Sequence, residues 1–313
     1  MSGLRIVFMG TPAFAIPTLS RIHDSRHQIV AVVSQPDRPR GRGKKLLPTP
    51  VKQFALENNL SPILQPEKLK DPDFVEALQA LQADVFVVVA YRILPEVVFT
   101  IPSRGTINLH PSKLPKYRGA APLNWTIING DRETAITTIF IKKEIDAGNI
   151  ILQRDVSIEP DETAGSLHDR LGPAGAELIL ESLDLIENDA VQAQKQDDSL
   201  VTPAPKLTKE TCHISFDQPA ESVKNWIHGL SPFPGAFAFY QDQTMKFYRA
   251  EVISEDPQTE PVGAIVKAEK SDFWIACNPG AVAIREIQLQ GRKRMKIEDF
   301  LRGTDIDQQV ILK

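Results

Sequence analysis

The sequence predicts an α/β protein of two domains, the first built on a parallel β-sheet and the second a small β-barrel. Apolar runs that suit strands alternate with helical patterns from the N-terminus onward, as expected of a parallel sheet with crossover helices. Five short β runs then fill about eighty residues near the C-terminus, which indicates a barrel. The length of 313 residues is comfortable for two domains.

Composition narrows the class of protein. The hydrophobic share is 42% and the charged share 24%, which is ordinary for a globular chain. No apolar run is long enough to cross a bilayer, and residues 4–9 read as a strand rather than a signal peptide, so we expect a cytoplasmic protein without a membrane partner. Cys212 and Cys277 lack metal-ligand spacing, and we predict no bound metal. The net charge of −4 confines any RNA contact to local basic patches.

The chain begins with the pattern of a βαβ unit. The apolar run 4–9 ends at Gly10, and we expect Thr11 to cap the following helix with Pro12 in its first turn. A second strand is expected at 29–33. The later glycines of a dinucleotide fingerprint are missing, so a nicotinamide-dependent dehydrogenase is a poor interpretation.

The alternation continues to about residue 187, and a polar, proline-dotted linker follows it. We therefore predict a first domain at 1–189, a linker at 190–208 and a second domain at 209–313. The expected helices are 51–59, 73–82, 121–129, 163–168, 174–187 and 220–228. The expected strands or extended segments are 60–66, 84–90, 106–110, 135–141, 150–152, 236–240, 245–250, 263–267, 273–277 and 281–288.

Residues able to carry chemistry lie at the end of the predicted strand 106–110. Because alternate residues of a strand share a face, Asn108 and His110 point the same way, at the sheet edge where α/β proteins bind ligands. Asp146 follows the next long strand and is expected on a neighbouring loop. An amide, an imidazole and a carboxylate suit a reaction that forms an oxyanion and moves a proton. Taken singly, these residues could instead be turn formers beside a structural histidine.

A basic segment, residues 35–45, follows the second predicted strand. Its prolines and glycines are expected to prevent both a helix and a ladder strand. A solvated loop is the simpler interpretation. The segment nevertheless follows the carboxyl end of a strand, so it could close on a phosphate backbone, with Arg42 binding a phosphate through two hydrogen bonds. The candidate RNA-binding residues are Arg38, Arg40, Arg42, Lys44 and Lys45.

Three stretches together resemble a known signature. Residues 108–112, 114–122 and 146–148 are similar to the signature of the formyltransferases that use 10-formyltetrahydrofolate. With matches at both ends, the chain resembles the methionyl-tRNA formyltransferases over essentially its whole length. The resemblance implies a Rossmann-like first domain, an OB-like second domain that binds tRNA, 10-formyltetrahydrofolate as donor and initiator methionyl-tRNA as acceptor. Nothing in the sequence demands a dimer, and we expect a monomer.

The resemblance also assigns roles to residues. The family's catalytic asparagine, histidine and aspartate match Asn108, His110 and Asp146, and its tRNA-gripping loop resembles the basic segment. Two positions depart from the family pattern, since Arg92 replaces a usual glycine and Lys113 a usual leucine. The implied folate-binding residues are Tyr91, Ile93, Leu94, Ser112, Lys113, Leu114 and Pro115.

Three other functions are compatible with parts of the sequence. A formyltransferase acting on a sugar nucleotide or another small amine would share the three catalytic residues but would not need the basic segment. A formyltetrahydrofolate hydrolase would use the same residues with water and would not need the barrel. A noncatalytic RNA-binding protein would explain the barrel and the basic segment, but it leaves Asn108, His110 and Asp146 unexplained.

Overall fold

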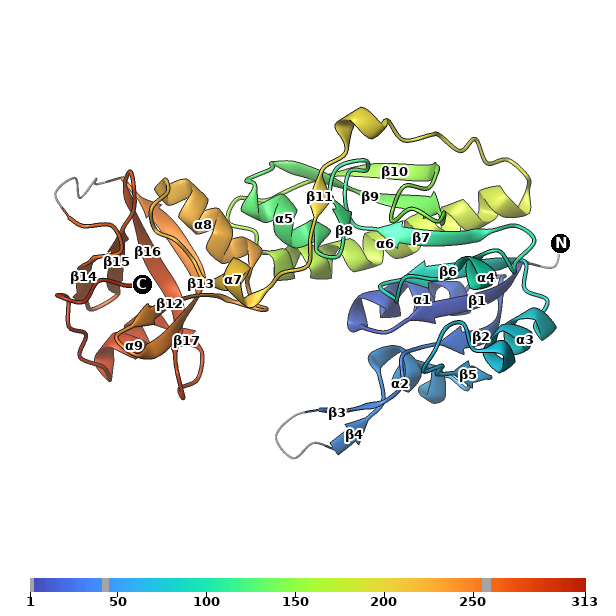
Figure 1. Ribbon diagram of the computed structural model, residues 1–313, viewed down its shortest axis with the longest axis horizontal. Coiled ribbons are helices and arrows are strands. Elements are labelled where there is room, and N and C mark those ends of the chain that lie inside the picture. The colour runs from blue at the N-terminus through green and yellow to red at the C-terminus, as the bar shows by residue number, and fades with distance from the viewer. Residues whose placement is uncertain (1–2, 41–44, 255–259) are drawn as a thin grey trace. The chain divides into compact units, whose positions relative to one another are not determined.

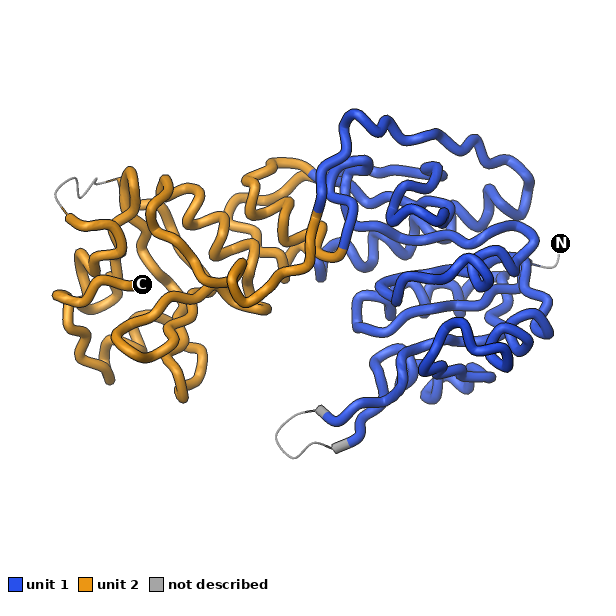
Figure 2. Tube along the Cα trace, in the orientation of Figure 1, with its two compact units in different colours: residues 1–119, 134–156, 168–203 blue, residues 120–133, 157–167, 204–313 orange. Residues whose placement is uncertain are grey.

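The computed structural model describes residues 3–40, 45–254 and 260–313 (Figure 1). The chain divides into two units, which are coloured in Figure 2. The first comprises residues 1–119, 134–156 and 168–203, and the second comprises 120–133, 157–167 and 204–313. The chain therefore passes between the units several times. The domain boundaries given above stay a prediction from the sequence.

A seven-stranded sheet forms the centre of the first unit, in the order β10-β9-β7-β6-β1-β2-β5. The chain adds β2 and β5 on one side of β1 and then returns to place β6 on the other side. β1 is therefore beside a topological switch point, where open α/β sheets bind ligands. The neighbouring pairs β5-β2, β2-β1, β1-β6 and β6-β7 are parallel, and β9 is antiparallel to β7. The strands are β1 (Arg5–Gly10), β2 (Gln28–Val33), β5 (Ile63–Leu64), β6 (Val85–Val89), β7 (Thr106–His110), β9 (Glu133–Phe140) and β10 (Ile150–Ser157).

Helices cover both faces of this sheet because its central strands are apolar on both sides. Val7, Met9 and Val88 face the side covered by α3 and α4. Leu109 faces α6 so closely that a Cβ added to Gly175 of that helix would lie 2.5 Å from Leu109 Cδ2. The helices are η1 (Ala13–Ala15), α1 (Ile16–His23), α2 (Pro50–Glu57), α3 (Pro72–Ala80), α4 (Glu96–Phe99) and α6 (Ala164–Glu187). These features confirm the predicted Rossmann-like fold.

The predicted cap at Thr11 is wrong. The Thr11 hydroxyl is buried without a hydrogen-bond partner among the described residues, and the chain first forms a 3-10 turn in which Ala15 N donates to Pro12 O. The α-helix begins only at Ile16, with Pro17 in its first turn. A helix started at Pro12 would place Pro17 in its interior, where a proline removes a hydrogen bond and clashes with the preceding turn.

The predicted break before Ala174 is also wrong, because α6 continues through Pro173. An interior proline costs about 3 kcal/mol. Leu171 precedes it and Leu178 and Ile179 follow it, and all three are buried. Burying one such side chain contributes about 1.5–3 kcal/mol, so three of them outweigh the proline.

The basic segment forms a hairpin, which corrects the prediction of no ladder strand. β3 (Arg38–Arg40) pairs antiparallel with β4 (Lys45–Leu47), with Pro39 opposite Leu46. A proline is tolerated here because a two-stranded ribbon has two open edges and alternates between bonded and non-bonded pairs. Figure 1 shows the hairpin extending away from the main sheet of its unit.

The second unit contains an antiparallel sheet in the order β12-β13-β16-β15-β14, with β17 paired to β16. All five strands expected in this region are present. The strands are β12 (Ala236–Tyr240), β13 (Gln243–Ile253), β14 (Ile265–Glu269), β15 (Asp272–Ala276), β16 (Ala281–Leu289) and β17 (Met295–Lys296). The helices of this unit are α5 (Pro122–Ile128), α7 (Lys209–Cys212), α8 (Ala220–Gly229) and α9 (Ile297–Arg302). Three short elements remain elsewhere in the chain: β8 (Arg118–Gly119), η2 (Asp198–Leu200) and β11 (Pro203–Ala204).

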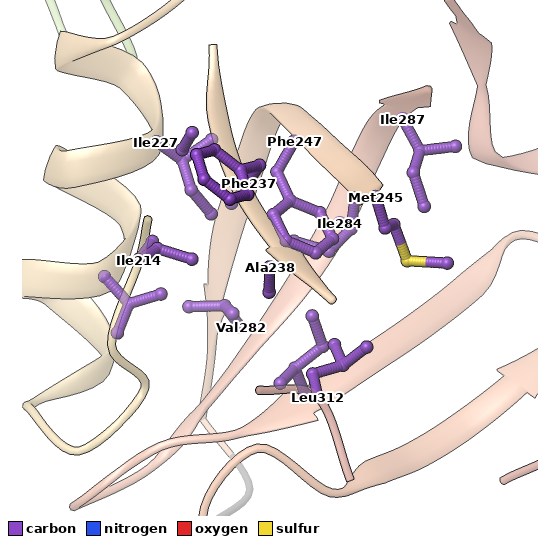
Figure 3. Close-up of a cluster of buried hydrophobic side chains, with 14 of the residues drawn as sticks. Ile214, Ile227, Phe237, Ala238, Met245, Phe247, Val282, Ile284, Ile287 and Leu312 are labelled. Carbon is purple, nitrogen blue, oxygen red and sulfur yellow. The ribbon is translucent and has the colours of Figure 1, made fainter. Parts of the chain in front are cut away.

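The core of the second unit follows the two-residue alternation of its strands. Met245 and Phe247 of β13 and Ile284 of β16 lie in one buried cluster with Ile227 of α8 (Figure 3). Residues 311–313 link the two outer strands of the sheet: Lys313 exchanges two backbone hydrogen bonds with Phe239, and Leu312 N donates to Gly263 O just before β14. Edges covered in this way are protected from pairing with other chains. No helix in the described ranges is long and apolar enough to span a membrane.

His228 of α8 is buried as a neutral ring. Its Nε2 accepts a hydrogen bond from the backbone N–H of Ala250 at 3.2 Å. The pKa of His228 is lowered from 6.5 to about 4, mainly by burial and also by Lys224 and Arg249, while Asp161 opposes the shift. The unfolded chain therefore takes up the proton first as pH falls. The stabilisation is complete above pH 6.5 and is lost between pH 6.5 and 4, by up to about 3 kcal/mol.

His228→Gln keeps an acceptor for the Ala250 N–H but does not titrate. We predict that, between pH 7 and pH 4.5, the free energy of unfolding of this variant falls by about 2 kcal/mol less than that of the wild type. All three tryptophans, Trp125, Trp226 and Trp274, belong to the second unit. Tryptophan fluorescence during urea unfolding therefore follows this unit. An equal loss of stability in the two proteins would contradict the prediction.

Candidate active site

The predicted catalytic residues of β7 lie on one face of the sheet. Asn108 is opposite Val88 of β6 and Ile139 of β9, and His110 is opposite Thr137 of β9. Because Val88 faces α3 and α4, the side chains of Asn108 and His110 project to that same side, at the carboxyl end of the strand. Asn108 is half-buried and His110 is buried.

His110 lies between a carbonyl and a carboxylate. Its Nε2 is 2.9 Å from the carbonyl oxygen of Tyr117, and its Nδ1 is 3.6 Å from Asp146 Oδ2. A carbonyl only accepts hydrogen bonds, so Nε2 carries a proton. Nδ1 is therefore the ring nitrogen that faces Asp146. The structure brings the predicted histidine and aspartate together, although they are 36 residues apart in the chain.

The loop that carries Asp146 is bent sharply and held on two sides. Asp146 has a positive φ of 52°, and its Oδ2 accepts a hydrogen bond from Gly119 N at 3.0 Å. Gln196 Nε2 donates to the carbonyls of Asp146 and Gly148, each at 2.8 Å. A Cβ on Gly148 would lie 1.5 Å from Phe140 O, so only glycine allows the loop to return this close to β9.

The sequence did not reveal Gln196, which lies within the predicted linker. It is buried, and its Oε1 accepts from Arg118 Nε at 3.0 Å and from Arg118 Nη2 at 2.8 Å. Gln196 thus joins the Asp146 loop to the segment that follows β7. A single glutamine in a polar stretch carries no sequence signal of such a role.

The segment 112–115 is shaped by its own hydrogen bonds. The Ser112 hydroxyl donates to Lys116 O at 2.7 Å, and the carbonyls of Ser112 and Leu114 accept from Thr137 and Gln153. Lys113 forms an ion pair with Asp155 at 3.1 Å. Ser112 and Leu114 are buried, and Pro115 is half-buried. These contacts fix the loop beside His110, while a role for its residues in folate binding stays a prediction.

The segment 91–95 follows β6 at the same edge of the sheet. Arg92, in place of the usual glycine, donates to Pro66 O at 2.7 Å, to Glu67 O at 3.0 Å and to the Tyr91 hydroxyl at 3.0 Å. Burial raises the pKa of Tyr91, and the arginine opposes this. Leu94 is buried, whereas Ile93 is 71% exposed and open to contact with a ligand.

Comparison with known proteins identifies the family of this chain. Residues 4–183 match the formyl transferase model, and residues 206–305 match its C-terminal domain model. Methionyl-tRNA formyltransferases of Bacteroides thetaiotaomicron and Geobacter sulfurreducens are 47% and 46% identical, covering 96% and 97% of this chain and 95% of each relative. That of Caldanaerobacter subterraneus is 45% identical over 99% of this chain and all of its own length.

The chain belongs to the methionyl-tRNA formyltransferase family. It is therefore a formyl-transferring enzyme.

Several solved structures share the fold of this chain. An N-formyltransferase from Helicobacter canadensis has a TM-score of 0.68 at 19% identity, covering 93% of this chain and all of that one. HypX from Aquifex aeolicus, in complex with tetrahydrofolic acid, has a TM-score of 0.66 at 18% identity over 98% of this chain and 49% of its own. At these identities the likeness concerns the fold alone.

Three of the five predicted RNA-binding residues, Arg38, Arg40 and Lys45, lie on the described strands of the β3–β4 hairpin. Arg38 is exposed on β3. The backbones of Arg40 and Lys45 pair with each other in the hairpin, and Arg42 and Lys44 lie outside the described residues. A role for these residues in RNA binding stays a prediction.

One group of side chains in the described part of the chain has metal-ligand spacing: His27, Asp184 and Glu187. The His27 Nδ1 accepts from Leu4 N at 3.1 Å, so the proton is on the Nε2 that would have to bind the metal. Arg26 Nη2 also forms ion pairs with both acidic residues, at 2.7 Å from Asp184 Oδ1 and 2.6 Å from Glu187 Oε2. The Arg26 guanidinium already pairs with both carboxylates, and the group is better explained as an ion-pair cluster than as a metal site.

We predict that Gln196→Ala lowers kcat by roughly tenfold or more, because the loop that positions Asp146 loses two hydrogen bonds. Gln194→Ala is a matched control, since Gln194 is exposed and pairs with Ile150 through its backbone. Steady-state formyl transfer with both variants measures the difference. Unchanged kcat in a folded Gln196→Ala protein would contradict a role for this residue in holding the site.

Proposed function

We propose that this protein transfers the formyl group of 10-formyltetrahydrofolate to the α-amine of methionyl-tRNA, the initiator form, producing N-formylmethionyl-tRNA. Membership in the methionyl-tRNA formyltransferase family supports the proposal. The observation that carries the chemistry is the Asp146 carboxylate 3.6 Å from His110 Nδ1, at a strand end that also bears Asn108.

The reaction exchanges one C–N bond for another. The amine of the methionyl group attacks the formyl carbon and forms a tetrahedral intermediate with a negatively charged oxygen. The bond between that carbon and folate N10 then breaks, and the proton lost by the amine ends on N10. Donors placed where the negative charge develops are the largest source of acceleration for such steps.

Asn108 and His110 are the proposed oxyanion donors. The Asn108 amide and the Nδ1–H of a protonated His110 would stabilise the oxyanion, since the His110 Nε2–H already donates to Tyr117 O. Asp146 holds the imidazole by its charge and, directly or through water, carries the proton from the amine towards N10. A free α-amine titrates near pH 8, so the acceptor needs positioning more than a strong base.

The acceptor distinguishes this proposal from its alternatives. A sugar-nucleotide formyltransferase or a hydrolase has the same catalytic needs, but neither requires a basic hairpin at the sheet edge. The relatives over the full chain favour the tRNA, and they leave no reason to prefer a noncatalytic RNA-binding protein. A monomeric state and a cytoplasmic location stay predictions from the sequence.

His110→Ala is predicted to lower the rate of formyl transfer by about 100- to 1000-fold, the usual cost of losing one oxyanion donor. His23→Ala is the control, because His23 is exposed on α1. The assay measures acid-stable formylmethionine on the tRNA. Near wild-type turnover by folded His110→Ala protein would overturn the assignment.

Arg42→Ala is predicted to reduce formylation of methionyl-tRNA while folate binding is retained, because the variant loses a cation that can bind a phosphate. Folate binding is measured separately by fluorescence titration. Consumption of the folate with water or a nucleotide sugar, without formylation of tRNA, would favour the alternative acceptors.

A further inference from the structure

A polar cluster joins the base of the β3–β4 hairpin to α2 and to the segment after β5. Lys52 Nζ binds Asp37 Oδ2 at 2.6 Å, and Gln65 Nε2 donates to Asp37 Oδ1 at 2.7 Å. Gln65 Nε2 also donates to Gln35 O at 2.8 Å. Both oxygens of the Asp37 carboxylate are therefore held immediately before β3 begins.

The returning arm of the hairpin is fixed to the same turn of α2. Thr49 caps this helix, with its Oγ1 accepting from Lys52 N at 3.1 Å. The Thr49 hydroxyl also lies 2.6 Å from Ser34 Oγ, and both of these side chains are buried. Lys52 thus contacts both arms, through its side chain to Asp37 and through its backbone to Thr49.

The place of Lys52 in α2 points to a specific role for this contact. Lys52 is the third residue of the helix, where the helix dipole disfavours a positive charge. The Lys52 and Asp37 side chains are only 22% and 20% exposed, so their ion pair is shielded from solvent. Lys52 is thus a cation where the helix dipole disfavours one, and its ion pair is shielded from solvent. This indicates that the pair serves the geometry of the hairpin.

The hairpin needs such a contact because it cannot fix its own direction. Its described residues form three pairs, and an isolated two-stranded ribbon is marginally stable in water. A rotation of about 10° at Asp37 would move the far end of β3 by roughly 2 Å, given about 3.3 Å per residue. Such a shift is enough to break a hydrogen bond to a phosphate.

We propose that Asp37, Lys52 and Gln65 form a clamp of positioning residues that fixes the direction of the basic hairpin for binding the RNA of methionyl-tRNA. This inference rests on the proposed function. It assigns these residues to the affinity for RNA and not to the formyl-transfer chemistry.

The direction in which one substitution changes the KM distinguishes the clamp from a simple effect of charge. Asp37→Asn removes a negative charge near a polyanion, so electrostatic attraction alone would lower the KM for methionyl-tRNA. The clamp predicts the opposite, a KM raised about 3- to 30-fold with kcat and the KM for 10-formyltetrahydrofolate unchanged. Lys52→Met is predicted to raise the KM to a similar extent, and the double variant to be no worse than either single variant.

Two further variants complete the test. Lys52→Arg keeps the ion pair and should restore most of the affinity. Glu57→Gln removes an exposed negative charge from the same helix without touching the clamp, and it should leave the KM unchanged. Thermal unfolding of each variant checks that the fold is retained.

The outcomes distinguish the two proposals. A wild-type protein that does not formylate methionyl-tRNA would overturn the proposed function and the clamp's role with it. A wild type that does formylate it, together with an Asp37→Asn variant of unchanged or lowered KM, would overturn the clamp alone. Additive effects of Asp37→Asn and Lys52→Met on the KM would also contradict the clamp, because they would show that the two residues act independently.

Discussion

The site depends on the return of the loop after β9, which brings Asp146 beside His110. The loop can close only because Gly148 has no side chain where it meets Phe140 O. Its bend is then held by Gln196 from one side and by Gly119 N from the other. With this contact in place, one carboxylate oxygen faces both a backbone N–H and the imidazole. Without it, the amide and the histidine of β7 would have no carboxylate beside them.

Backbone conformations around the site show how tightly the chain is turned. Ala90, Tyr117 and Asp146 all have positive φ angles. Ala90 and Tyr117 belong to segments that follow β6 and β7 at this edge of the sheet, whereas Asp146 lies on the loop that returns from β9, a strand antiparallel to β7. Such conformations cost a non-glycine residue of order 1–3 kcal/mol, and they persist only where surrounding contacts determine them. At Tyr117 the contact is with the site itself, since the carbonyl of this residue accepts from His110 Nε2. The turns thus place backbone groups, as well as side chains, around the histidine.

The sequence was informative wherever one local rule decided the structure. The strand ending at His110 follows from its β propensity and the proline after it, and the opposite directions of Asn108 and Leu109 follow from strand geometry. The sequence was least informative where distant contacts overrode a local rule. Pro173 stays in a helix because residues on both sides are buried, and Pro39 sits in a ladder because that ladder has open edges. Gln196 could not be found, because its role comes from distant contacts, with carbonyls about 50 residues earlier in the chain and with Arg118.

The central claim is that His110 keeps a proton on Nε2 for Tyr117 O and turns Nδ1 towards Asp146 and the reacting formyl group. Nitrogen-15 NMR of the labelled histidine ring tests this most directly. The account predicts that Nε2 is the protonated nitrogen of the neutral ring, and that Asp146→Asn shifts the Nδ1 resonance more than that of Nε2. A neutral ring with its proton on Nδ1 and a bare Nε2 would contradict the account, because a lone pair would then face the carbonyl.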